Sequence, residues 1–141
     1  MRVLAALGKI DRAPTEFRRR SEDVSHGGVL MALPALLAGG LLRHASRFFS
    51  LPPGYYGLEH IFILLGFLAL CRIKSVEQLR YTAPGEWGEL LGLDRCPEAK
   101  TLRAKVKLLA AGDGEGWAAQ LCDDWMQAGP AATGTLYIDG H

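Results

Sequence analysis

Two long apolar runs, at residues 29–42 and 61–71, limit the fold of this 141-residue chain more than any other feature. A helix that spans a bilayer needs about 20 consecutive apolar residues, and both runs are shorter. Pro34 and a Gly-Gly pair interrupt the first run, while Glu59 and Arg72 flank the second. The runs therefore predict buried helices of a soluble, cytoplasmic protein rather than membrane spans.

Composition sets the outer bounds of the prediction. A hydrophobic content of 49% supports one real core or two small ones. Sixteen basic and fifteen acidic residues leave a net charge of +1, so attraction to nucleic acid must depend on a local patch. Cys71, Cys96 and Cys122 are widely spaced and predict reduced thiols, because structural zinc sites use close ligand pairs.

Residues 1–57 are predicted to form an N-terminal arm and a helical hairpin. The arm contains three consecutive arginines from Arg18 to Arg20, but Glu16 and Glu22 flank them, which favours a solvated face over a DNA-binding arm. A Pro-Pro turn at 51–57 closes this part of the chain. Its two tyrosines either stack on a base or cover the core, and the second role is the more common one.

Residues 58–111 show the layout of a helix-turn-helix segment. A first helix is predicted from Leu58 to about Leu79, with Ser75 as a candidate cap for a separate short helix at 76–81. A second helix is predicted at 86–91, where Gly92 ends it, and a last helix at 98–110. In a helix-turn-helix module the final helix enters the major groove of DNA.

The last helix of this segment carries the candidate DNA-binding residues. Three apolar residues fall on one side of it, and the opposite side holds a basic stripe made of Lys100, Arg103 and Lys107. This arrangement predicts one face that packs and one that contacts phosphates. Helix stability alone also favours cations toward a helix C-terminus, so a structural role stays open.

Residues 112–141 are predicted to form a linker helix and one β-strand. Apolar residues spaced by four, including Trp117 and Trp125, predict a helix at 117–127. Asp123 and Asp124 on it are expected to be solvated charges rather than metal ligands. The sequence TLYIDGH predicts a strand from Thr135 to Asp139, which places the Asp139 carboxylate at a strand end.

Three stretches resemble the N-terminal part of bacterial insertion-sequence transposases of the DDE type. They read YGLEHIFILLGFLALCRIKSVEQLR, PGEWGELLGLDRCPEAKTLRAKVKLLA and LYIDGH, and the earlier GGVLMALPALL is similar as well. The resemblance implies N-terminal helices that bind the terminal repeats of the element. It also implies an RNase H-like domain that cuts and joins DNA with Mg²⁺, in which Asp139 matches the first acidic metal ligand.

The same resemblance suggests that the chain stops where such a catalytic domain begins. Further acidic ligands are expected beyond the first strand, and only His141 follows Gly140 here. We therefore expect a mainly α protein with one terminal strand that binds transposon-end DNA but is inactive alone and needs no cofactor. The alternatives are a helical interaction module without DNA affinity and a small membrane protein, and the oligomeric state is left open.

Overall fold

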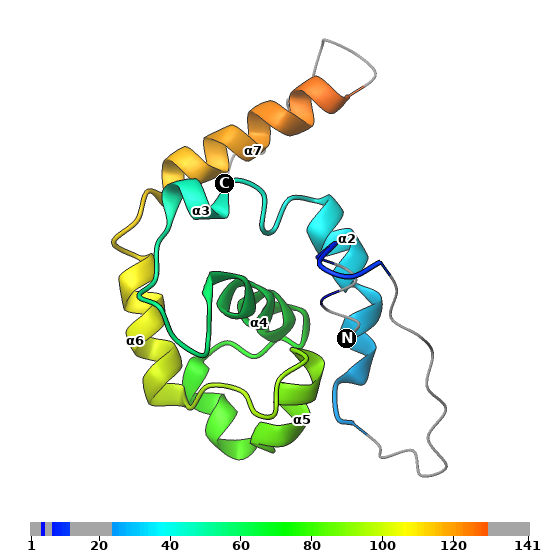
Figure 1. The fold of residues 1–141 in the computed structure, drawn as a ribbon, viewed down its shortest axis with the longest axis vertical. Coiled ribbons are helices and arrows are strands. Elements are labelled where there is room, and N and C mark those ends of the chain that lie inside the picture. The colour runs from blue at the N-terminus through cyan, green and yellow to red at the C-terminus, as the bar shows by residue number, and fades with distance from the viewer. Residues whose placement is uncertain (1–3, 5–6, 12–23, 130–141) are drawn as a thin grey trace, which may run out of the picture.

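The regular secondary structure of the described part of the chain is exclusively helical. The computed structural model describes residues 4, 7–11 and 24–129, and within these ranges no β-strand occurs. This confirms the mainly α prediction. The elements in chain order are η1 (Gly27–Met31), α2 (Leu33–Ala38), α3 (Ala45–Phe48), α4 (Leu58–Leu70), η2 (Val76–Tyr81), α5 (Pro84–Leu90), α6 (Ala99–Leu109) and α7 (Gly114–Ala128) (Figure 1).

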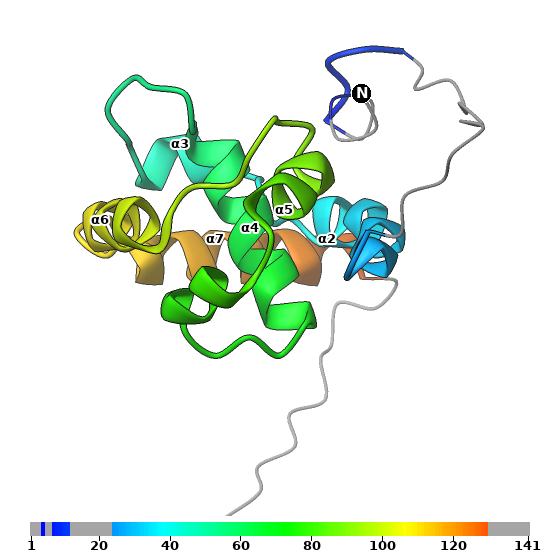
Figure 2. The same cartoon turned by 90° about the horizontal axis from the view of Figure 1, so that it is seen from below.

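Helix α4 forms the centre of the molecule. It is seen nearly end-on in Figure 1, with the other helices arranged around it. Figure 2 shows α6 and α2 on opposite sides of α4. Four side chains of α4 are 0% exposed: Ile61, Ile63, Leu64 and Phe67. This confirms the burial predicted for the second apolar run. The same hydrophobic cluster includes Leu33, so residues before and after the 51–57 turn share one core.

The first apolar run does not form the buried helix that was predicted. It divides into η1 and α2, and Met31 is 88% exposed while Leu33 is buried. Pro34 lies in the first turn of α2, where its missing N–H costs nothing, and the Gly-Gly pair ends the helix. Gly40 has a φ of 101°, a conformation that favours glycine. Because Pro34 and the Gly-Gly pair both interrupt this fourteen-residue run, it cannot form one continuous buried helix.

The chain also breaks after α4, so a continuous helix to Leu79 is wrong and the alternative of a separate short helix is confirmed. Arg72 has a φ of 56°, which stops α4. The chain re-enters helical geometry at η2, where the Ser75 Oγ accepts a hydrogen bond from the Glu77 N–H at 3.2 Å. This side-chain cap satisfies an N–H that the first turn of a helix leaves free.

The connection from α5 to α6 covers residues 91–98 and opens with a tight turn. Gly92 adopts a φ of 71° after α5, and the Leu93 N–H bonds back to the Gly88 carbonyl at 2.8 Å. A Cβ at Gly88 would lie 2.4 Å from the backbone of Arg95, so only glycine allows this approach. The turn thereby fixes where α6 starts relative to α5.

Helix α7 begins three residues earlier than the predicted range. The Asp113 carboxylate caps it by accepting a hydrogen bond from the Gly116 N–H at 2.8 Å. No helix among residues 24–129 is both long and apolar enough to cross a membrane. The predicted strand at 135–139, with Asp139, and the triple-arginine run lie outside the described residues.

Candidate nucleic-acid interface

Helix α6 is fixed to the core by its apolar side. Leu102 is 0% exposed and Leu109 is 7% exposed, while Val106 is half-buried against the same cluster. Its first residue, Ala99, is buried as well. The orientation of α6 is therefore set by packing and does not depend on its charged residues.

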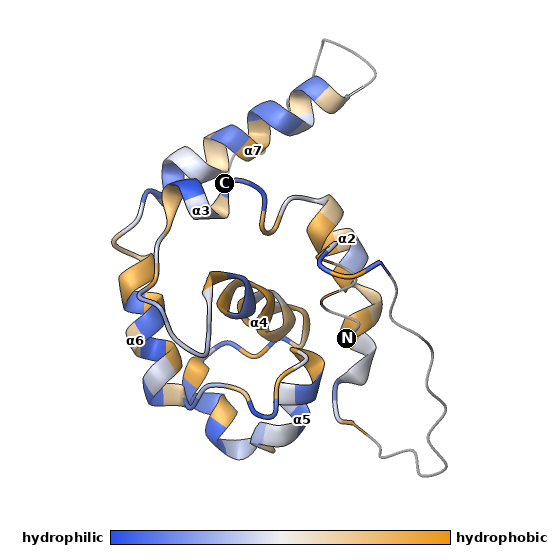
Figure 3. Cartoon of the chain, in the orientation of Figure 1, coloured by the Kyte–Doolittle hydropathy of each residue, from blue (hydrophilic) through white to orange (hydrophobic). Residues whose placement is uncertain are grey.

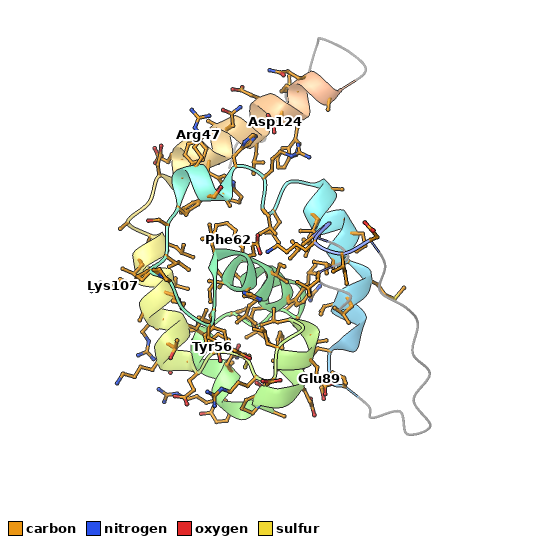
Figure 4. All side chains as sticks on the ribbon, in the orientation of Figure 1. Arg47, Tyr56, Phe62, Glu89, Lys107 and Asp124 are labelled. Atoms are coloured by element: carbon orange, nitrogen blue, oxygen red, sulfur yellow. The ribbon has the colours of Figure 1, made fainter. Side chains whose placement is uncertain are left out.

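All the charged side chains of α6 are basic, and they share its remaining surface with exposed Thr101, Ala104 and Leu108. Lys100 and Lys107 are exposed, as predicted, and Lys107 lies at the outer edge of the helix in Figure 4. Lys105 is a fourth cation, half-buried on the other flank of the helix. It was missed because it lies apart from the predicted stripe. Among the described residues these three lysines make no ion pair, so their charge is available to an anionic partner.

Arg103 differs from its neighbours in α6. It is exposed, but its guanidinium forms an ion pair with Glu77 of η2, and Glu77 also pairs with Arg80 at 3.0 Å. One member of the predicted stripe, Arg103, is therefore part of a network between two helices, whereas Lys100 and Lys107 stay outside it. A charge reversal at Arg103 would place a carboxylate beside Glu77.

The two tyrosines of the 51–57 turn have separate surroundings. Tyr55 is 55% exposed, whereas Tyr56 is half-buried and packs against the core. Their rings meet edge to face with centroids 4.9 Å apart. Burial raises the pKa of Tyr56, and a hydrogen bond from Arg95 partly opposes that rise. Tyr56 thus covers the core as expected, and only Tyr55 presents an open ring.

The acidic residues of α7 do not form a metal site. Asp124 accepts hydrogen bonds from His44 Nε2 at 2.9 Å and from Arg43 Nη1 at 3.3 Å. Both contacts lower the pKa of Asp124, and the contact with His44 has the larger effect. The prediction that it is a solvated charge is therefore wrong, whereas Asp123 is exposed. Within the described ranges no group of three His, Cys, Asp or Glu side chains could hold a metal ion.

The chain as a whole resembles a known protein family. Residues 1–141 match a protein family described as "Transposase protein". The chain belongs to this transposase family. Comparisons with curated proteins and with solved structures gave no match. Family membership supports a role in transposition and indicates DNA as the partner.

Proposed function

We propose that this member of the transposase family binds transposon-end DNA through α6, in the manner of a helix-turn-helix segment. The proposal depends on one observation: core packing fixes α6, while Lys100, Lys105 and Lys107 have no ion-pair partner among the described residues. The order α4, η2, α5, a glycine-containing turn and α6 fits such a segment, with α6 as the helix that enters the major groove.

The charge distribution supports phosphate binding by this helix. Phosphate contacts by lysine give most of the affinity in non-specific protein–DNA binding, and they position a recognition helix for base contacts. A net charge of only +1 for the whole chain makes a local patch necessary, and α6 supplies it.

Replacement of two free lysines tests the proposal. In Lys100→Gln with Lys107→Gln, duplex affinity measured by fluorescence anisotropy should fall by about tenfold. The log–log salt slope should decrease in size by about 2, since each lost phosphate contact removes about 0.9. The duplexes should include one with an end sequence of a related element and one of unrelated sequence.

The control removes two positive charges elsewhere, in Lys9→Gln with Arg47→Gln. Arg47 makes no ion pair among the described residues, and Lys9 pairs with Glu59. In Figure 4, Arg47 lies near α7 and away from Lys107. This variant should keep the affinity and the salt slope of the parent chain. Equal losses in the two double variants would show that binding depends on total charge and would contradict a role for α6.

A helical interaction module without DNA affinity is the second candidate function. Trp125 and Met126 of α7 are 53% and 58% exposed, which favours a contact with another protein surface. The same titrations separate the two candidates. An interaction module predicts weak duplex binding that neither double variant changes.

We also propose that Asp139 is the first acidic ligand of a DDE-type, RNase H-like site that uses Mg²⁺. The support is its place in the YIDG sequence together with membership in the transposase family. Two metal ions need several carboxylates, so the isolated 141-residue chain should not nick plasmid DNA with Mg²⁺ or Mn²⁺. Nicking by the pure chain that disappears in Asp139→Ala would contradict this expected inactivity.

A further inference from the structure

Two arginines from different helices converge on a single carboxylate at the junction of η2 and α6. Arg80 lies three residues after Glu77 in η2, and Arg103 reaches the other oxygen of the same carboxylate from α6. The side chains of Arg80 and Arg103 are 61% and 54% exposed, and that of Glu77 is 39% exposed. The cluster is therefore open to solvent at the edge of the proposed DNA-binding helix.

A pair of guanidinium groups around one carboxylate is also suited to one phosphate. Each arginine contacts one oxygen of the Glu77 carboxylate through its Nη2, and a guanidinium N–H donates to phosphate oxygens as it does to carboxylate oxygens. A phosphodiester offers two non-bridging oxygens in place of the two carboxylate oxygens. The structure thus presents a preformed arrangement of donors whose occupant is an internal anion.

We propose that Arg80 and Arg103 form a phosphate-binding subsite, occupied by the Glu77 side chain until a DNA backbone phosphate replaces it. This inference rests on the proposed DNA-binding function of α6. Exposed ion pairs contribute little stability, so the exchange costs little. Only the Glu77 side chain has to turn away, because its backbone N–H stays bonded to the Ser75 cap at 3.2 Å.

Glu77→Gln tests the exchange directly. Glutamine keeps the size of the side chain but no longer competes as an anion, so duplex affinity should rise by about threefold, the scale of one exposed ion pair. Glu89→Gln is the matched control because it removes the same charge from α5, and Glu89 lies on the side of the molecule away from Lys107 (Figure 4). The control should leave affinity unchanged.

A double-mutant cycle identifies the arginines as the phosphate ligands. Arg80 lies outside α6, yet Arg80→Gln should weaken duplex binding. The loss of affinity should be larger in the Glu77→Gln background, where no internal anion has to leave the arginines. A second experiment adds inorganic phosphate at constant ionic strength and measures how much bound DNA it displaces. If it displaces DNA from the parent chain more effectively than from Arg80→Gln, the subsite also accepts free phosphate. If the two respond alike, the subsite takes only a backbone phosphate.

The outcomes distinguish this inference from the function on which it rests. If Glu77→Gln binds like Glu89→Gln, or only lowers the melting temperature, the cluster is a structural tie between η2 and α6 and the inference is wrong. In that case the α6 lysine variants can still lose affinity, and DNA binding stands. If the α6 lysine variants bind DNA as well as the parent, the proposed function fails and this inference fails with it.

Discussion

Helices α6 and α7 carry opposite charges and are attached to the molecule in different ways. Figure 3 shows alternating apolar and polar segments on both helices, so the difference between them lies in their contacts. Helix α6 is anchored by buried Leu102 and Leu109. Helix α7 fully buries only Leu121 and packs the Trp117 ring against Phe49 and Phe62. Its further anchors are polar contacts with the 39–44 turn.

The polar anchors of α7 come from three side chains. The Trp117 indole N–H donates to the Arg43 carbonyl at 2.8 Å, and the Trp125 indole N–H donates to the Gly39 carbonyl at 2.9 Å. Asp124 adds the contacts with His44 and Arg43. Apolar burial fixes α6 and leaves its three lysines available for a partner, whereas α7 uses the charge of Asp124 for its own attachment.

Among substitutions that test how α6 and α7 are attached, the largest loss of stability is expected at Leu102 of α6. Leu102→Asp places an unpaired carboxylate in the core and should cost about 4 kcal/mol or more of the free energy of unfolding. That is most of the stability of a typical small domain. Circular dichroism should show loss of helix at room temperature. Leu108→Asp is the control, since Leu108 is 47% exposed in the same helix and should change stability by less than about 0.5 kcal/mol.

Leu121→Ala should have a smaller and more local effect. The Leu121 side chain packs against Gly40, where an added Cβ would lie 2.7 Å from Leu121 Cδ2. The truncation should cost about 2–3 kcal/mol. Hydrogen exchange should show α7 opening while α4 and α6 stay protected. Equal loss of protection in all three helices would contradict the separate attachment of α7.

Trp125→Phe isolates one polar anchor. The substitution keeps an aromatic ring but removes the N–H that donates to the Gly39 carbonyl. Loss of one such hydrogen bond should cost about 1 kcal/mol, measured by urea denaturation. Exposed Gln127 of the same helix provides the control, because Gln127→Ala removes no contact with the 39–44 turn and should leave the unfolding midpoint unchanged.

The smallest expected effect is the pH dependence contributed by Asp124. Contacts with His44 and then Arg43 hold the pKa of its carboxyl below the usual value, so the folded state favours the ionised form. This stabilisation is complete above the unfolded pKa of about 3.9 and is lost as the pH falls through the lower folded pKa. In Asp124→Asn, melting temperature should therefore change less than in the parent chain between about pH 5 and pH 2. Parallel curves for the two proteins would contradict an ionic anchor.

Sequence patterns correctly predicted the helices whose apolar runs, caps and stops lie within a few residues of one another. The apolar run in α4, the Ser75 cap of η2 and the Gly92 stop after α5 act within a few residues, so they could be recognised without a structure. The 29–42 run was misjudged because apolar content alone does not say whether a segment has a partner surface on every side. In the structure this segment covers one side of α4 and leaves Met31 in solvent.

For the candidate interface as well, some features follow from the sequence and others only from the fold. The sequence alone determined that α6 has an apolar side and a basic side, because helical periodicity fixes the direction of each side chain around the axis. Only the tertiary structure decided which charges are already used. Glu77 is 26 residues from Arg103, and Asp124 is 80 residues from His44, and no local pattern predicts such contacts. Ion pairs between distant segments form only when core packing brings the backbones together, so the pattern of charges follows from the sequence and their availability follows from the fold.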